Sequence, residues 1–323
     1  MLSAVEGAVR GSLRCPVCGA PLDDVADGSG GFVCTGVDCA TVFPGVDGIP
    51  ILINEGRSVF SRGDFLSRRR TYFEPRGDLL ERVERILPEL QRPKGKRRFD
   101  QLVELLLERA PRPLVLVVGG GVEGRGIDRL LQAVPPIVLV ETDVSLGPRT
   151  TAVVDAHDIP FADDTFDGVV AQAVLEHVLD PVRVVSEIHR VLKPGGVVYA
   201  QTPFMQQVHG GAYDYTRYTL LGHRRLFNAF EEVDSGAGNG PGAALAWSWQ
   251  YFLLSFATAK IPRAALRAVA KLSAFWLKYV DVYLERKPGA LDAATGFYFI
   301  GSKSETRLPD RELVKQYRGG LTG

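Results

Sequence analysis

The sequence has no excess of charge of either sign. Its 323 residues include 38 lysines and arginines and 38 aspartates and glutamates, so the formal net charge at pH 7 is zero. Proteins that hold nucleic acid by its phosphates usually carry a basic excess, so this balance argues against that class. Basic residues do cluster within residues 56–112, where they indicate either a phosphate contact or a solvated linker surface: Arg68, Arg69, Arg70, Lys94, Lys96, Arg97 and Arg98.

Cysteine is also scarce, because the chain has only four, at Cys15, Cys18, Cys34 and Cys39. Two close pairs can bring four thiolates to one tetrahedral ion, and a small segment with few core residues needs such an ion to fold. The spacing therefore predicts a structural zinc ion with no open coordination position. Disulfides or free thiols are the alternatives, and disulfides would require an oxidising compartment.

Long apolar runs are missing from the beginning of the chain. Residues 1–14 contain Glu6, Arg10 and Arg14 and lack the apolar core of a signal peptide, so we expect a cytoplasmic protein whose thiols stay reduced. Internal repeats and low-complexity tracts are missing too. The length and the hydrophobic fraction of 46% fit a soluble protein with one large domain and appendages.

Residues 155–200 predict two strands of a parallel sheet joined by a helix. Apolar runs of strand length occur at residues 166–171 and 197–200, and apolar residues between them recur at helical spacing. Asp180 is a good N-cap, and the Lys-Pro-Gly-Gly segment at residues 193–196 is a typical helix stop. A β-α-β unit implies a parallel sheet, whose ligands bind at the carboxyl ends of the strands.

A glycine turn follows an earlier apolar run. Residues 114–118 are expected to form a strand that breaks at residues 119–121, which are all glycine, before a helix. A turn without Cβ atoms lets the backbone approach a ligand closely, and the helix N-terminus offers free N–H groups. The next predicted strand, residues 137–140, ends near Glu141 and Asp143, where an acid could accept hydrogen bonds from both hydroxyls of a ribose.

In this order, these motifs resemble the class I S-adenosylmethionine-dependent methyltransferases of type 11, over roughly residues 113–236. The resemblance implies an α/β fold with a Rossmann-like, doubly wound, mostly parallel seven-stranded sheet, and S-adenosylmethionine as cofactor. It also implies cofactor contacts from Gly119 and Gly121 to the methionine part, Asp143 to the ribose, Asp155 and Ala156 to the adenine, and Gln172 in the cleft. Glu141 is the alternative for the ribose.

Two features depart from that family's pattern. Val117 stands where the first strand often has an acidic residue, and Val122-Glu123-Gly124 makes the glycine turn longer than usual. Residues 15–53 resemble a second family, the short zinc ribbons related to activators of tRNA methyltransferases. We therefore expect a zinc ribbon (1–55), a helical linker (56–112) with helices near 79–90 and 99–108, a methyltransferase domain (113–305) and a tail (306–323).

The loop after the fifth strand is rich in polar and aromatic residues and is expected to lie over the cofactor's methyl group. His209 could accept a proton from an acceptor hydroxyl, and Asp214 could orient it. Arg217 could hold a substrate carboxylate or phosphate, or anchor the loop to its own acids, and Tyr215 is a further substrate-binding candidate. A purely structural turn is the alternative. Methyl transfer mainly needs in-line positioning, so it does not require a base.

A long insertion, residues 236–288, precedes the last predicted strand. No charged residue occurs from Ser235 to Ala259, and basic and apolar residues alternate from Lys260 to Lys287. We expect a helical lid or substrate wall. Residues 242–287 could contact the inner face of the membrane peripherally, whereas the alternative is a helical hairpin packed on its own domain or on a dimer partner.

The sequence thus predicts a methyltransferase that acts on an oxygen of a small molecule, a glycan or a lipid-linked sugar. A ribosomal or transfer RNA methyltransferase is the alternative within enzymes, because some such enzymes join a zinc ribbon to this fold. A non-catalytic scaffold that binds the cofactor and recruits a partner through its ribbon is the alternative of another class. Methylation of adenine or glutamine nitrogen is disfavoured, because Ala171-Gln172-Ala173 stands where those enzymes have Asn or Asp followed by Pro-Pro and an aromatic residue.

Overall fold

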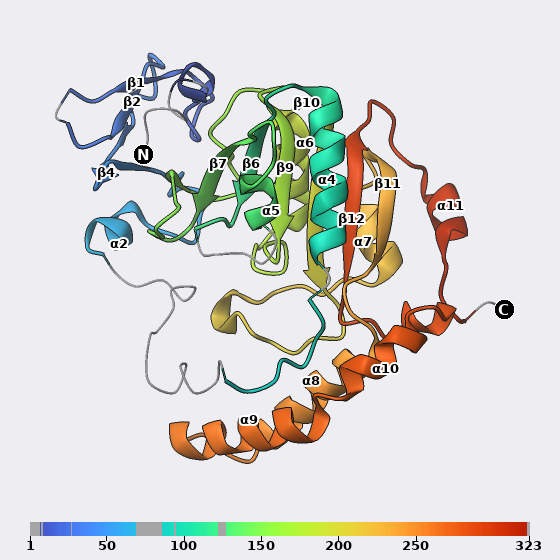
Figure 1. The fold of residues 1–323 in the computed structure, drawn as a ribbon. Helices are drawn as coiled ribbons and strands as arrows, with labels where there is room; N and C mark the ends of the chain where they lie inside the picture. The colour runs from blue at the N-terminus through green and yellow to red at the C-terminus, as the bar shows by residue number, and fades with distance from the viewer. Residues whose placement is uncertain are drawn as a thin grey trace.

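The computed structural model describes residues 7, 9–26, 28–68, 86–93, 95–121 and 127–321. Figure 1 shows a central sheet covered by helices, a small ribbon at the N-terminal side and a group of helices that projects from the opposite side. Most of the helix predicted near residues 79–90, the arginines at 69 and 70, Lys94 and the lengthened glycine turn at 122–124 lie outside the described residues.

The central sheet has the order β11-β12-β10-β9-β6-β7-β8-β5-β4. Its first seven strands in this order are the predicted ones: β6 (Leu114–Val118), β7 (Val138–Asp143), β8 (Ala152–Val154), β9 (Phe166–Gln172), β10 (Leu192–Pro203), β11 (Phe230–Ala237) and β12 (Gly296–Lys303). Strands β6 to β10 run parallel, and β12 lies antiparallel between β10 and β11. The Rossmann-like α/β fold is therefore confirmed.

Two more strands extend this sheet to nine, which corrects the predicted number of seven. They are β5 (Ile49–Leu52), parallel to β8, and β4 (Gly45–Val46), antiparallel to β5. Both belong to the predicted ribbon. Ile51 and Leu52 pair with Val153 and Val154 and have no exposed surface, so pairing with the sheet edge buries apolar side chains that the short ribbon cannot cover alone.

Helices cover the two faces of the sheet. They are α4 (Gly95–Arg109) and α5 (Ile127–Leu131) on one face, and α6 (Pro181–Val191) and α7 (Leu220–Leu226) on the other (Figure 1). α4 buries Phe99, Leu102 and Leu106, which form one apolar stripe at helical spacing. α6 starts as predicted, because the Asp180 side chain accepts a hydrogen bond from the Arg183 N–H at 3.1 Å.

The predicted helical insertion lies between β11 and β12. It comprises α8 (Pro241–Leu254), α9 (Lys260–Ala274) and α10 (Leu277–Leu284), which project at the bottom of Figure 1. The buried Asp281 carboxylate accepts hydrogen bonds from the Gly242 and Ala243 N–H groups at 2.7 and 3.0 Å, so α10 caps the start of α8. None of the helices that the structure describes has the length and apolar character of a transmembrane span.

The N-terminal ribbon is a three-stranded antiparallel sheet of β1 (Leu22–Asp24), β2 (Phe32–Cys34) and β3 (Val42–Phe43). Its apolar side chains join the same buried cluster as those of β6, β9 and α6. The ribbon therefore shares its core with the main domain.

The remaining short helices are η1 (Arg10–Ser12), α2 (Arg62–Leu66), η2 (Gly211–Tyr213), η3 (Pro288–Ala290), α11 (Asp310–Leu313) and η4 (Val314–Gln316).

Candidate functional site

A first cavity of about 340 Å³ opens at the carboxyl ends of β6, β7 and β8. The residues that line it at these strand ends are Val118, Gly119, Asp143, Val144, Asp155, Ala156 and His157. Further walls come from Ala173, Val174, residues 177–180, Arg183, Tyr215, Arg57, Val59 and Phe60. The predicted cofactor residues Gly119, Asp143, Asp155 and Ala156 are thus brought together around one space.

Gly119 forms the tight turn at the end of β6. Its φ of +72° is in the left-handed region, and a Cβ atom there would lie 2.5 Å from Cγ2 of Val174. Its N–H donates to the Thr142 carbonyl oxygen at 2.8 Å, which closes the turn against β7. Gly121 lines neither this cavity nor the next, and its N–H donates to Oδ2 of Asp143 at 2.9 Å. Gly121 therefore positions Asp143, and its contact with a ligand stays a prediction.

Asp143 and Glu141 end up in different environments. Asp143 lines the first cavity, accepts a hydrogen bond from the Ser145 hydroxyl at 2.6 Å, and has its pKa raised by burial. Glu141 is absent from the lining and forms a two-point ion pair with Arg149, whose Nε lies 2.7 Å from Oε2. Of the two acids, only Asp143 lines the first cavity, and its contact with a ribose stays a prediction.

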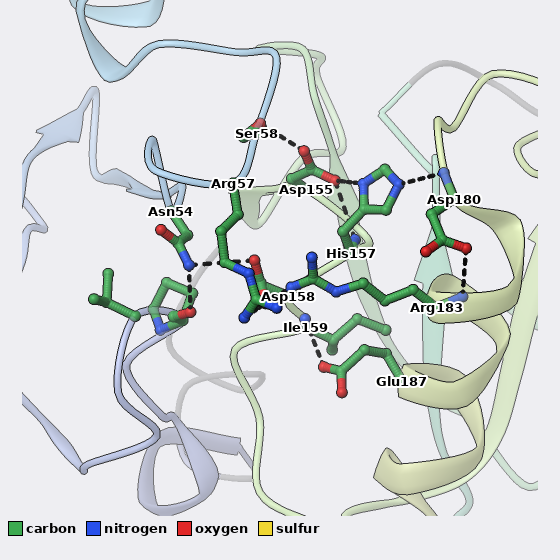
Figure 2. A network of polar contacts seen from close by, with 12 residues as sticks. Asn54, Arg57, Ser58, Asp155, His157, Asp158, Ile159, Asp180, Arg183 and Glu187 are labelled. Carbon is green, nitrogen blue, oxygen red and sulfur yellow. Dashed lines mark hydrogen bonds and ion pairs between the residues drawn. The ribbon is translucent and has the colours of Figure 1, made fainter.

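Asp155 belongs to a polar network that Figure 2 shows. Its carboxylate accepts from the Ser58 hydroxyl at 2.5 Å and contacts Nδ1 of His157 at 2.6 Å. Nε2 of His157 accepts the Asp180 N–H at 3.0 Å, so Nδ1 carries the ring proton and donates to Asp155. Burial alone would raise the pKa of Asp155, but the hydrogen bonds from His157 and Ser58 outweigh burial and lower it.

Residues that follow the ribbon form one wall of the first cavity, which the sequence did not predict. Phe60 lines the cavity, and its ring stacks on Tyr213 with centroids 5.5 Å apart. Asn54 donates to the Pro16 carbonyl oxygen at 3.0 Å and to Asp158 at 3.3 Å, so the ribbon's first cysteine turn is tied to the site (Figure 2). No motif marks these residues, because their role depends on β5 docking beside β8.

A second cavity, of about 270 Å³, lies at the carboxyl ends of β6, β9 and β10. Val118, Gly119 and Ala173 line both cavities, so one elongated ligand could occupy the two together. Gln172, predicted to line the cofactor cleft, lines the second cavity, and its Oε1 atom is buried without a hydrogen-bond partner among the described residues. A buried acceptor of this kind is expected to bind a ligand donor.

Asp214 contacts His209 mainly through the His209 backbone, and its predicted role in orienting the ring stays a prediction. The buried Asp214 carboxylate accepts hydrogen bonds from the N–H groups of His209 and Gly210 at 2.8 and 3.0 Å and is paired with Arg217. Burial would raise the pKa of Asp214, but these bonds, led by those from Arg217, hold it far below its ordinary value. Nδ1 of His209 lies 3.5 Å from Asp214, which is too long for a good hydrogen bond.

Arg217 anchors the loop rather than facing a cavity. It donates to the carbonyl oxygens of Gln206, Gln207 and Thr216 as well as to Asp214, and it lines neither the first nor the second cavity. The predicted alternative, a loop anchor, is thus the arrangement observed. Tyr215 lines the first cavity, on the side of the predicted cofactor rather than the substrate.

Glu176 is the carboxylate that faces the His209 ring. Nε2 of His209 lies 3.7 Å from Oε1 of Glu176, and both residues line the second cavity. Burial would lower the pKa of His209, but Glu176 and the Gln207 carbonyl raise it. No candidate role for Glu176 was predicted from the sequence. The contact of Glu176 with His209 follows from the folding of β9 beside β10, which brings the two loops together, and could not be found from local sequence.

A third cavity, of about 280 Å³, lies between the insertion and the second cavity. It shares Gln91 and His209 with the second cavity, and its other walls are Glu89, Leu90, Trp247, Gln250, Tyr251, Leu254, Arg263, Arg267 and Lys271. The Tyr251 hydroxyl donates to the Val208 carbonyl oxygen at 2.9 Å, which holds α8 against the loop that carries His209. An aromatic and basic wall thus adjoins the second cavity.

The four cysteines converge as zinc ligands do. Their sulfur atoms all lie within 4.8 Å of one another, with 3.8 Å between Cys15 and Cys39 and 3.4 Å between Cys18 and Cys34. Sulfurs around tetrahedral zinc are about 3.8 Å apart. Burial raises the pKa of the Cys15 thiol to about 12, whereas the Thr41 hydroxyl lowers that of Cys39 to about 6. The donor set fits zinc, which would offset the cost of ionising a buried thiol.

Comparison with known proteins identifies the domain around these cavities. Residues 123–200 match the family model described as a methyltransferase domain. A demethylmenaquinone methyltransferase from Symbiobacterium thermophilum is 41% identical over 69 residues, which are 20% of this chain and 28% of that protein. A protein of Mycolicibacterium smegmatis named a probable S-adenosylmethionine-dependent methyltransferase is 32% identical over 115 residues, 33% of this chain and 44% of that protein. The matches thus span less than half of either relative.

Solved structures are more distant. The phosphoethanolamine N-methyltransferase 2 of Haemonchus contortus, in complex with S-adenosyl-L-methionine, has 16% sequence identity and a TM-score of 0.41, over 64% of this chain and 53% of that one. A similarity at this level says nothing about the substrate. The resemblance of the ribbon to the activator family stays a prediction.

Proposed function

We propose that this chain, which carries a class I S-adenosylmethionine-dependent methyltransferase domain, transfers a methyl group from S-adenosylmethionine to an oxygen of a small molecule, a glycan or a lipid-linked sugar. One observation carries the proposal: two cavities that share Gly119 lie at the carboxyl ends of adjacent parallel strands. The first has the acids for a nucleoside, and the second has the polar groups for an acceptor.

In this reaction the acceptor oxygen attacks the methyl carbon as the carbon–sulfur bond breaks. The electron pair of that bond goes to sulfur, which gives neutral S-adenosylhomocysteine, and the hydroxyl proton leaves the oxygen. The protein's main task is to hold the oxygen in line with the carbon–sulfur bond. His209 stands between the second and third cavities and is the residue we propose to contact the acceptor hydroxyl.

The third cavity supports an amphipathic, anionic acceptor. Trp247 and Tyr251 offer apolar and stacking surface, and Arg263, Arg267 and Lys271 offer positive charge. A sugar joined to a lipid through phosphate has both properties. Methylation of a quinone carbon is a second candidate, because the Symbiobacterium relative is a demethylmenaquinone methyltransferase and the same aromatic wall would hold a quinone ring.

Calorimetric titration with S-adenosylmethionine and S-adenosylhomocysteine, followed by a label-transfer screen of lipid, glycan and RNA fractions, tests the proposal. We expect micromolar cofactor binding and label in the lipid or glycan fraction. Label in RNA would favour the RNA methyltransferase alternative. Cofactor binding without transfer to any fraction, with or without partner proteins, would favour a scaffold and count against the proposal.

We also propose that the insertion contacts an anionic membrane surface. The insertion exposes large apolar side chains, among them Phe252, Phe256, Ile261, Trp276 and Tyr283. Basic residues interleave with them, namely Lys260, Arg263, Arg267, Lys271 and Lys278. Aromatic and basic side chains together favour the interface between headgroups and acyl chains, where a lipid-linked acceptor would also lie.

The membrane contact predicts that the protein sediments with anionic vesicles at low salt. Phe252→Asp and Trp276→Asp should each return most of the protein to the supernatant, because each places a charge in the apolar layer. Val314→Asp, a change at an equally exposed valine outside the insertion, is the matched control and should sediment like the unchanged protein. Complete recovery of the unchanged protein in the supernatant would contradict the contact.

A further inference from the structure

A group of three side chains lies where the first and second cavities meet, because His177 lines the first and Glu176 and His209 line the second. Glu176, His177 and His209 each offer one ligand atom, and these atoms lie within 4.8 Å of one another. Glu176 and His177 follow β9, and His209 lies in the loop after the adjacent strand β10. A Cβ atom on Gly210 would lie 2.4 Å from the His177 ring, so the glycine lets the two loops approach closely.

Glu176 is buried without a hydrogen bond. The residue has 1% of its surface exposed, and neither carboxylate oxygen has a hydrogen-bond partner among the described residues. Nε2 of His177 and Nε2 of His209 lie 3.8 and 3.7 Å from Oε1 of Glu176, beyond hydrogen-bond range. A buried carboxylate in this state is costly unless a cation compensates it.

The hydrogen bonds of the two rings decide which nitrogens are acceptors. Nδ1 of His177 lies 2.7 Å from the Tyr213 carbonyl oxygen, and Nδ1 of His209 lies 3.2 Å from the Gln207 carbonyl oxygen. A carbonyl oxygen can only accept, so each Nδ1 carries a proton and donates. In the neutral rings each Nε2 then turns a lone pair toward Glu176. Imidazole ligands of metals typically hold their second nitrogen in this way.

Three acceptor atoms that converge on one point repel one another unless a positive charge lies among them. A proton on His209 would supply that charge electrostatically, but at 3.7 Å it would still leave both oxygens of Glu176 without a hydrogen bond among the described residues. A metal ion reaches farther, because ligand atoms around tetrahedral zinc with nitrogen and oxygen donors are about 3.4 Å apart. Small side-chain rotations would close the remaining gap.

We propose that Glu176, His177 and His209 bind a divalent transition-metal cation, such as zinc or iron, beside the second cavity. Two imidazoles and one carboxylate suit such ions better than magnesium or calcium, which prefer oxygen donors. Three protein ligands leave coordination positions open toward the cavity, unlike the closed four-cysteine site.

The role of this cation rests on the proposed function. A hydroxyl bound to a divalent cation is more acidic, so the acceptor's proton can leave to water and its oxygen then attacks the methyl carbon. His209 then acts as a ligand, and the cation activates the hydroxyl. Binding of the cation itself depends on neither cofactor nor acceptor.

Cobalt(II) titration of the full chain, with its ribbon already loaded with one zinc, tests the site. We expect one further cobalt per chain, with weak visible absorption bands and without the intense charge-transfer absorption that thiolate ligands produce. Glu176→Gln, which keeps the shape of the side chain, should weaken cobalt binding by more than about 100-fold. Gln206→Ala, at a second-cavity residue outside the triad, is the matched control and should bind cobalt normally.

Thermal unfolding separates a lost ligand from a misfolded variant. Cobalt should raise the unfolding midpoint of the unchanged protein and of Gln206→Ala, and leave that of Glu176→Gln unchanged. His209→Gln gives a second test from a different loop. Failure of zinc and cobalt to bind beyond the ribbon, or undiminished binding by Glu176→Gln, would overturn the inference. Methyl transfer that proceeds without this cation would overturn its role and leave the proposed function standing.

Discussion

Loss of the N-terminal zinc site is expected to abolish tight cofactor binding, in addition to unfolding the ribbon. Structural zinc in small domains contributes on the order of 10–16 kcal/mol, as much as a whole domain's stability, so the ribbon should not fold without it. The Pro16 carbonyl, inside the first cysteine turn, accepts a hydrogen bond from Asn54. A few residues later, Ser58 donates to Asp155 and Phe60 lines the first cavity. Disorder in the ribbon would therefore remove a wall of the cavity.

The measurement is calorimetric titration with S-adenosylhomocysteine of a Cys18→Ser, Cys39→Ser double variant, with zinc analysis of the same samples. We expect one zinc per chain in the unchanged protein purified without chelator and none at this site in the variant. The variant should bind S-adenosylhomocysteine at least tenfold more weakly. Val37→Ser is the matched control, because Val37 lies between the same cysteines and is 97% exposed. Unchanged affinity for S-adenosylhomocysteine in the zinc-free variant would show that the cofactor site does not depend on the ribbon.

Asp143→Asn is expected to weaken cofactor binding by at least tenfold. A hydrogen bond to a charged group is worth about 1.5–3 kcal/mol, and each 1.4 kcal/mol is about tenfold in affinity. The amide keeps the shape of the side chain and its contacts to the glycine turn, but it loses the charge and one acceptor. A cofactor analogue without ribose hydroxyls should bind Asp143→Asn and the unchanged protein equally well, which would assign the effect to the ribose.

Glu141→Gln is the matched control for this prediction. It removes the same charge two residues away and breaks the pair with Arg149, so it should lower stability while leaving cofactor affinity intact. The reverse result, with affinity lost in Glu141→Gln and kept in Asp143→Asn, would move the ribose role to Glu141.

The affinity for the cofactor should also depend on pH through Asp143. Burial raises the pKa of this carboxyl above its ordinary value, so protonation on acidification begins at a higher pH than for an exposed aspartate. In the proposed role the carboxylate form would accept both ribose hydroxyls, so affinity should fall as the pH falls through the raised pKa. Calorimetry across a pH series checks this, and Asp143→Asn should lack the dependence. A dependence that persists in the variant would point to another group.

The succession of strands along the chain could be predicted because each strand and turn has a local cause. Apolar runs at β6, β9 and β10, the cap at Asp180 and the glycines after β6 act within a few residues of chain. In parallel sheets the ligand side follows from strand direction, so Gly119, Asp143, Asp155 and Ala156 could be placed around one cavity from sequence. The cysteine spacing likewise predicted the cluster.

The sequence by itself determined the α/β class, the succession of strands and helices along the chain, the predicted cofactor edge and the cysteine set, because these depend on local periodicity and turn chemistry. Only the tertiary structure decided which side chains meet across loops. It turned His209 toward Glu176, brought Ser58 to Asp155 and placed Phe60 at the first cavity. Those contacts join residues whose meeting is set by the docking of β5 beside β8 and of β9 beside β10, where burial of apolar surface brings distant segments together.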